Sequence, residues 1–144
     1  MHIPFHKPIL PSQNEIGNIL SDSLNTGWLT TGPQVKQFEE KLQIYLNSKH
    51  VVCTNSCTAA LHLSLAVNNF KKNKKVLVPA ITFSATAAVA LYCDLIPVFV
   101  DIDPKTLTMS FEDLKKKYSK DCVAVIPVHF GGQPCEMEKI MPWA

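Results

Sequence analysis

Four short apolar segments, separated by stretches with helical spacing, constrain the fold of this chain most strongly. They occupy residues 50–54, 76–79, 96–101 and 122–128. Strands that are apolar throughout are buried on both faces, and strands separated by helices pair in parallel through crossovers. With 47% hydrophobic and 18% charged residues, the 144-residue chain is apolar enough to form a core. The sequence therefore predicts a three-layer α/β/α fold with a mostly parallel sheet.

The first third of the chain is predicted to be helical. Ser12 and Glu15 have the spacing of a capping box, and Thr31 and Gln34 form a second such pattern. The loop between the two helices carries Trp28, a larger side chain than a simple connector requires. We expect residues 1–48 to be a helical segment with a loop, and residues 49–144 to be the α/β portion of the same domain. A helix predicted to begin at residue 136 is cut off at the chain end, so we expect this domain to be incomplete.

Composition argues against several classes of function. All 14 basic residues are lysines, and arginine is the usual reader of guanine edges and phosphates, so nucleic-acid binding is disfavoured. The five cysteines are odd in number, and residues 1–8 lack the apolar segment of a signal peptide, which predicts a reduced, cytoplasmic protein. No apolar run approaches the ~18–20 residues that span a bilayer. Cys53 and Cys57 have no second ligand pair, so no metal site is predicted.

The most informative local pattern is the turn over residues 53–60. An apolar segment ends there, small polar residues follow, and a helix begins. The free amides of a helix N-terminus and the helix dipole form an anion site, to which the Ser56 and Thr58 hydroxyls add donors. An ordinary N-cap that serves only its own helix explains the same residues equally well. Neither the dinucleotide glycine pattern nor a nucleotide-binding Lys-Ser/Thr loop is present, which argues against NAD or ATP.

Two further segments follow the carboxyl ends of predicted strands, where open α/β sheets bind ligands. Residues 79–86 include Phe83, which is either a ring that stacks on a planar ligand or a core aromatic; without further context, the core interpretation is favoured. Residues 128–134 combine His129 with two glycines that allow the backbone to approach a ligand closely. The histidine alone is more often structural than catalytic.

Five segments in the same order and spacing resemble one known family. They are Gly27–Pro33, Asn55–Leu63, Pro79–Thr86, Pro97–Ile102 and His129–Pro134. Together they resemble the N-terminal part of the DegT/DnrJ/EryC1/StrS aminotransferases, which aminate keto sugars on nucleotide carriers. The resemblance covers almost the whole chain. It implies the large domain of a fold-type I aminotransferase, with pyridoxal 5'-phosphate as cofactor.

The resemblance also implies roles for individual residues. The family's phosphate-binding turn corresponds to Ser56, Cys57, Thr58 and Ala59, with cysteine where the family commonly has glycine or alanine. Phe83 corresponds to the aromatic residue that stacks on the pyridine ring, which reverses the interpretation favoured above. The loop with Trp28, Thr30 and Thr31 corresponds to a segment near the substrate, often at a dimer interface. The loop from His129 to Pro134 borders the site without an assigned role.

The family's catalytic lysine and the acidic partner of the pyridine nitrogen lie in later segments that these 144 residues do not contain. We therefore expect this chain alone to be inactive. In an intact enzyme the resemblance implies a nucleotide-linked keto sugar as substrate, glutamate as amino donor, a homodimer and a role in polysaccharide or lipopolysaccharide synthesis. Two alternatives stay open: a related sugar dehydratase, and a non-catalytic product that associates with a full-length homologue.

Overall fold

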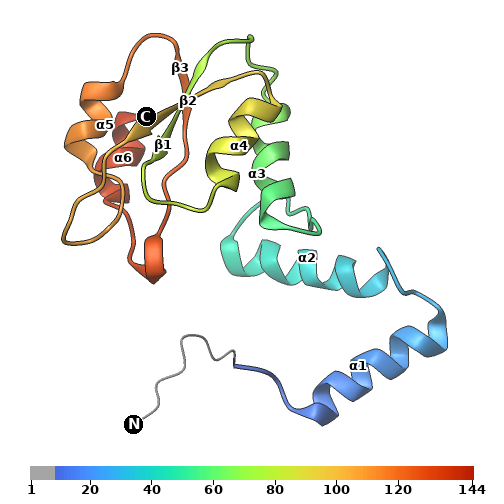
Figure 1. Ribbon diagram of the computed structural model, residues 1–144. Coiled ribbons are helices and arrows are strands. Elements are labelled where there is room, and N and C mark those ends of the chain that lie inside the picture. The colour runs from blue at the N-terminus through green and yellow to red at the C-terminus, as the bar shows by residue number, and fades with distance from the viewer. Residues whose placement is uncertain (1–8) are drawn as a thin grey trace. The chain divides into compact units, whose positions relative to one another are not determined.

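A computed structural model describes residues 9–144 (Figure 1). The segment in which no signal-peptide pattern was found, residues 1–8, lies outside the described residues. The chain forms two compact units, one that ends at Cys53 and one from Thr54 to Ala144. Within residues 9–144, no helix combines the length and the apolar character needed to cross a bilayer.

The N-terminal unit contains helices α1 (Gln13–Thr26) and α2 (Pro33–Leu46). The predicted capping box is confirmed: the Ser12 amide donates to Glu15 Oε2 at 2.9 Å, and the Glu15 amide donates to Ser12 Oγ at 3.4 Å. The second predicted box is wrong, because α2 is capped by Gly32 without a side-chain hydrogen bond. Pro33 opens α2 instead, since its fixed φ suits the first helical position and its missing N–H costs nothing there.

The predicted strand at residues 50–54 is also wrong, because these residues form an irregular connection. The Cys53 amide donates to Glu39 Oε1 of α2 at 2.8 Å rather than to a neighbouring strand. The pattern of a short apolar run does not by itself show whether the run forms a buried strand or another kind of segment. This hydrogen bond joins residues 14 positions apart, a contact that sequence spacing does not show.

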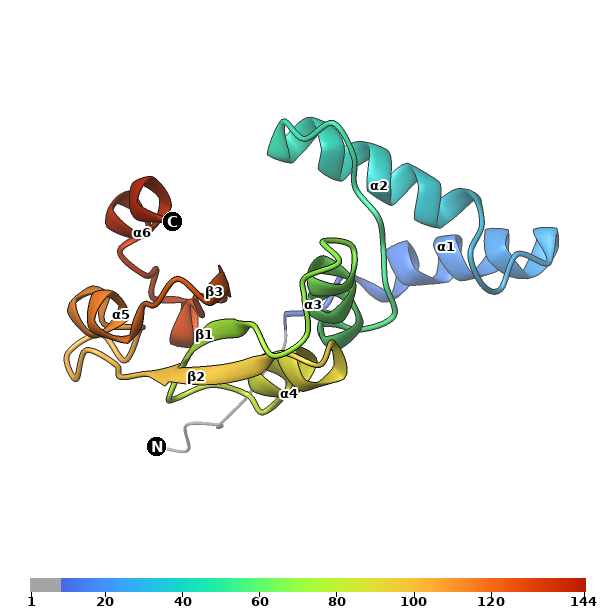
Figure 2. The same cartoon turned by 90° about the horizontal axis from the view of Figure 1, so that it is seen from above.

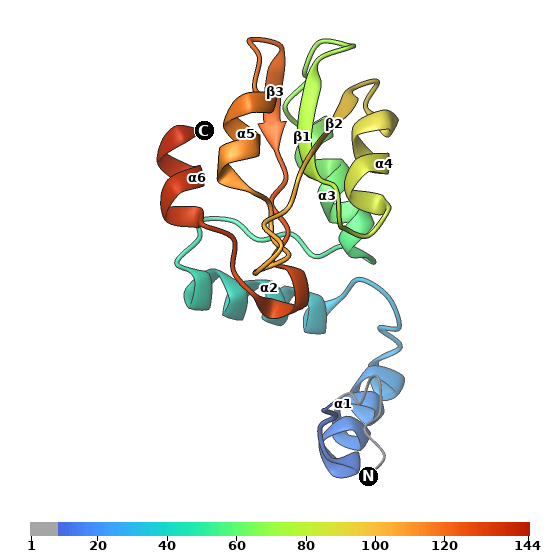
Figure 3. The ribbon, with the colours of Figure 1, turned by 60° about the vertical axis from the view of Figure 1, so that its left-hand side comes forward.

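The C-terminal unit alternates helices with parallel strands. Its elements are α3 (Cys57–Ala66), β1 (Lys75–Pro79), α4 (Ala85–Tyr92), β2 (Ile96–Val100), α5 (Phe111–Lys117), β3 (Cys122–Val125), the 3-10 turn η1 (Phe130–Gly132) and α6 (Met137–Trp143). The strand order is β2-β1-β3, and Leu77 in the middle of β1 pairs with Val98 on one side and Val125 on the other (Figure 3). The central strand is therefore the second of the four apolar segments.

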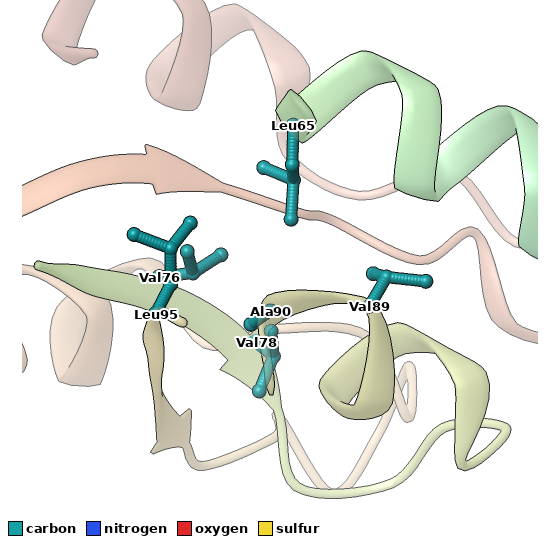
Figure 4. Packing of buried hydrophobic residues seen from close by; sticks show 6 residues of the cluster. All are labelled: Leu65, Val76, Val78, Val89, Ala90 and Leu95. Atoms are coloured by element: carbon teal, nitrogen blue, oxygen red, sulfur yellow. The ribbon is translucent and has the colours of Figure 1, made fainter. Parts of the chain in front are cut away.

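Two hydrophobic clusters cover the two faces of the central strand. On one face, Val76 and Val78 pack with side chains of α3 and α4, among them Leu65 and Val89 (Figure 4). On the other face, Leu77 packs with side chains of α5 and α6. The helices lie in pairs on opposite sides of the sheet (Figure 2). This arrangement confirms the predicted three-layer fold, because alternate residues of a strand point to opposite faces.

Candidate active site

The candidate site lies in the C-terminal unit, where segments far apart in the sequence meet. Two of these segments follow the carboxyl ends of β1 and β3, and the third is the N-terminal turn of α3. Together they line an open cavity of about 400 Å³. Its lining residues are Cys57, Thr58, Leu61, Thr82, Phe83, Ala85, Thr86 and residues 126–129. The volume falls in the usual range of small-molecule sites.

The first turn of α3 has unused hydrogen-bond donors. The Ser56 side chain accepts from the Ala59 amide at 3.1 Å, and the Ser56 carbonyl accepts from the Ala60 amide at the same distance. In the part of the chain that the structure describes, the amides of Cys57 and Thr58 have no such partner. Ser56 therefore caps its own helix, and the amides of Cys57 and Thr58 stay unpaired in this part of the chain. Binding of an anion by these amides stays a prediction.

The side chains of this turn differ in how they relate to the cavity. Thr58 is half-buried in the lining, and its hydroxyl has no hydrogen-bond partner among residues 9–144. Cys57 is exposed and also borders the cavity. Ser56 and Ala59, by contrast, are not among the lining residues, and the Ala59 amide is already bound by Ser56. Of the four predicted phosphate-binding residues, Cys57 and Thr58 therefore line the cavity and Ser56 and Ala59 do not. Their role as cofactor ligands stays a prediction.

Phe83 is exposed at the cavity rather than packed in the core. Its side chain is 77% accessible, so the core interpretation of this aromatic residue is wrong. The Phe83 carbonyl accepts from the Thr86 amide at 3.0 Å, and the Thr82 and Thr86 hydroxyls bond to each other at 2.8 Å. These bonds anchor the segment between β1 and α4, so that it presents an apolar ring to the cavity from a fixed backbone.

His129 reaches the same cavity from the segment after β3. Its Nδ1 accepts from the Cys135 amide at 3.1 Å, and the buried Cys135 Sγ donates to the Val128 carbonyl at 3.2 Å. These two bonds close the glycine-containing loop on itself. Gly131 and Gly132 both have positive φ (61° and 84°), a conformation that glycine adopts without steric cost.

The side chains that line the cavity carry neither a carboxylate nor an ammonium group. None of the lining residues is aspartate, glutamate or lysine, so no carboxylate opposes a phosphate there. The unpaired amides and the dipole of the ten-residue helix α3 are the groups at this cavity that are expected to attract an anion. In residues 9–144, histidine, cysteine, aspartate and glutamate form no group of three or more that is able to hold a metal ion.

The predicted substrate-side residues lie in the N-terminal unit. Trp28 packs against Gly32, where an added Cβ would approach Trp28 Cε3 to 2.9 Å, so this glycine makes room for the indole. A small cavity of about 80 Å³ lies beside Trp28 and Pro33. Thr30 and Thr31 are exposed in the same loop. A role for these three side chains at the substrate stays a prediction.

Sequence reasoning missed several lining residues of the cavity. Thr82 and Thr86 lie in the segment 79–86, in which only Phe83 was singled out, yet their paired hydroxyls border the cavity. Leu61 and the Ile126–Pro127 pair supply apolar walls. Ile126 and Pro127 could have been predicted as lining residues, because they lie just beyond β3 and parallel strands bring their carboxyl ends to one edge of the sheet.

Known proteins resemble this chain over nearly its full length. Spore coat polysaccharide biosynthesis protein SpsC of Bacillus subtilis is 38% identical over 139 residues, which are 96% of this chain and 35% of SpsC. A protein assigned as a sugar aminotransferase from Streptococcus pneumoniae, in its pyridoxal-phosphate form, matches with a TM-score of 0.88 and 34% identity over 99% of this chain and 36% of its own. The Escherichia coli GDP-4-keto-6-deoxy-D-mannose-3-dehydratase, with hydrated pyridoxal phosphate, matches with a TM-score of 0.85 and 28% identity over 94% and 36%.

This chain therefore spans about a third of the length of these relatives. The profile of the DegT/DnrJ/EryC1/StrS aminotransferase family matches residues 12–144 and so includes every segment of the cavity. The five motifs, the three-layer fold and this match lead to one conclusion: the chain belongs to the DegT/DnrJ/EryC1/StrS aminotransferase family.

Proposed function

We propose that this chain provides the phosphate-binding and ring-stacking parts of a pyridoxal-phosphate site, in an enzyme that aminates a keto group of a nucleotide-linked sugar. The observation that carries the proposal is the cavity that brings Thr58 and Phe83 together. A phosphate fits the first turn of α3, where two amides and one hydroxyl are free. A planar heterocycle fits the exposed ring of Phe83.

Each group has a separate task in this site. The amides of Cys57 and Thr58 and the Thr58 hydroxyl bind and orient the phosphate, while the helix dipole favours its negative charge. Phe83 excludes water from one face of the heterocycle and holds it in a plane. The cofactor, when bound, supplies an electron sink that stabilises negative charge on the reacting carbon. The lysine and the acidic residue that complete this chemistry in the family are not among these 144 residues.

The class of substrate is proposed from the relatives. One relative is named for polysaccharide biosynthesis, and another acts on a GDP-linked keto sugar. These two names support a nucleotide-linked keto sugar as the substrate class. Glutamate as amino donor and a homodimeric enzyme are part of the proposal and come from the family resemblance alone. Because the chain spans about a third of these relatives, their activity belongs to this chain only as a proposal.

A sugar dehydratase is the second candidate, favoured by the structural match to the Escherichia coli 3-dehydratase. The two functions share the cofactor and differ in the residue at the family's lysine position. The genomic sequence that follows the codon of Ala144 separates them. A lysine in a Ser-Phe context there supports the aminotransferase, whereas a different residue at that position supports the dehydratase.

Titration with pyridoxal phosphate tests the proposed site directly. We expect saturable binding, seen as a change in cofactor absorbance, and competition by inorganic phosphate. Thr58→Val keeps the shape of the side chain but removes the hydroxyl, so it should weaken both ligands by roughly 3- to 10-fold, the value of one hydrogen bond. Thr26→Val, on α1 of the other unit, is the matched control. Binding that inorganic phosphate does not displace, or that Thr58→Val leaves unchanged, would contradict the assignment.

A further inference from the structure

Charge is distributed unevenly over the C-terminal unit, and the proposed function does not use this asymmetry. The turns that precede β1, β2 and β3 and the last turn of α5 lie together at the amino edge of the sheet, opposite the cavity (Figure 3). This edge carries eight lysines and two aspartates: Lys71, Lys72, Lys74, Lys75, Lys115, Lys116, Lys117, Lys120, Asp94 and Asp121. The carboxyl edge, with the first turns of α5 and α6, carries six carboxylates and two lysines: Asp101, Asp103, Glu112, Asp113, Glu136, Glu138, Lys105 and Lys139. The amino edge is therefore strongly positive, although the net charge of the whole chain is only +2.

Polar contacts join the three turns of the amino edge. The Lys75 amide donates to the Asp121 carbonyl at 2.9 Å, and Lys74 Nζ pairs with Asp121 Oδ1 at 2.6 Å. Lys72 Nζ pairs with Asp94 Oδ2 at 2.7 Å. Both aspartates of the edge are thus already paired with a lysine, so they do not offset the charge of the other lysines.

Four exposed lysines of this edge have no carboxylate within ion-pair distance among residues 9–144. These four edge lysines are Lys71, Lys116, Lys117 and Lys120. Lys116 and Lys117 lie in the last turn of α5, where the helix dipole attracts cations. Lys71 and Lys120 lie in turns outside any helix, so the dipole does not account for them. Clustered like charges repel one another, and an anionic partner relieves that repulsion.

The residues beside the edge lysines indicate the class of partner. Tyr92 and Tyr118, at the carboxyl ends of α4 and α5, are 61% and 52% exposed. A tyrosine has an apolar ring and a polar tip, which suits the headgroup region of a bilayer. Protein interfaces are depleted in lysine, and nucleic-acid readers use arginine, which this chain lacks. A lysine cluster flanked by tyrosines fits an anionic lipid surface better than either of these partners.

We propose that the amino edge of the sheet binds the surface of a bilayer that contains anionic lipids. Lysine acts as a point charge, so each edge lysine is attracted to such a surface without a fixed geometry. Binding at the surface does not require a membrane-spanning helix. Because the cavity lies at the opposite edge of the sheet, it faces away from the lipid and stays open to solvent.

Co-sedimentation of the 144-residue protein with lipid vesicles tests this proposal. One set of vesicles contains about 30% phosphatidylglycerol in phosphatidylcholine, and the other is phosphatidylcholine alone. We expect the protein to bind the anionic vesicles and not the neutral ones. Raising the salt concentration to about 1 M, where charges are screened over about 3 Å, should release it.

Two variants with the same net charge separate the amino edge from the charge of the whole chain. The edge variant replaces the four edge lysines with glutamine. The control variant replaces four other exposed lysines without an ion-pair partner in the described part of the chain: Lys36, Lys41, Lys49 and Lys105. A lysine near an anionic surface contributes roughly 5-fold in affinity, so the edge variant should bind at least about 10-fold more weakly. The control variant should bind as the wild type does, and the double variant Lys71→Gln/Lys120→Gln, which leaves α5 unchanged, should be intermediate.

Three outcomes would overturn the proposal. The first is a wild-type protein that does not sediment with anionic vesicles. The second is equal binding of the edge variant and the control variant, because the effect would then come from net charge and not from this edge. The third is displacement of the protein from the vesicles by poly(U) RNA at an equal concentration of phosphate, which would identify a nucleic-acid partner.

Discussion

Replacing Phe83 with leucine tests the central contact of the proposed site. Phe83 is 77% exposed, so its packing contributes little to folding. Leucine keeps an apolar side chain of similar bulk but removes the flat aromatic face. We expect the free energy of unfolding to change by less than about 0.5 kcal/mol, as for other surface substitutions.

The effect on cofactor affinity should be larger. A heterocycle that covers one face of the ring removes roughly 50 Å² from water, about a quarter of what an aromatic side chain can bury. At about 25 cal/mol per Å² this contributes about 1.2 kcal/mol, and the aromatic pair adds about 0.5–1.5 kcal/mol. Leucine recovers part of the first contribution. The net loss of about 1–2 kcal/mol corresponds to a roughly 5- to 30-fold higher Kd for pyridoxal phosphate.

The assay combines absorbance titration of pyridoxal phosphate with urea unfolding of the same variant. Phe38→Leu is the matched control, because Phe38 on α2 is 55% exposed and lies outside the cavity. Inorganic phosphate should bind Phe83→Leu and the wild type equally, since it does not reach the ring. The stacking argument is refuted if Phe83→Leu binds pyridoxal phosphate as tightly as the wild type, or if phosphate affinity falls in parallel.

Two further predictions concern stability. Leu77→Ala should lower the free energy of unfolding by about 2–5 kcal/mol, because Leu77 is 1% exposed at the centre of the sheet, whereas Leu91→Ala at a 60% exposed position should change it by less than about 0.5 kcal/mol in the same urea titration. The hydrogen bond from Lys74 Nζ to Asp121 Oδ1 at 2.6 Å, with the lysine charge, lowers the pKa of that carboxyl. Its contribution to stability is therefore complete above the ordinary aspartate pKa near 4 and is lost as the pH falls through the lower folded-state value. Asp121→Asn should flatten the acid side of the unfolding midpoint plotted against pH, and an unchanged profile would show that the pair does not couple to folding.

Local patterns in the sequence predicted those features of the fold that neighbouring residues decide. The Ser12–Glu15 capping box needs only groups three positions apart, and Gly27 ends α1 with a positive φ of 74°. The continuous apolar character of residues 76–79 predicted a strand buried on both faces, as β1 is. At residues 50–54 the same pattern failed, because a strand also needs a neighbouring strand to pair with, and the described sheet contains only β2, β1 and β3.

In the candidate site, too, some features follow from local sequence and others from the tertiary structure. The free amides at Cys57 and Thr58 follow from a helix that begins there, which the sequence indicates by itself. That Phe83 is exposed, and that it shares a cavity with Thr58 and His129, was decided by the tertiary structure. The physical reason is the parallel sheet: it brings the ends of β1 and β3 to one edge although 46 positions separate Pro79 from Val125.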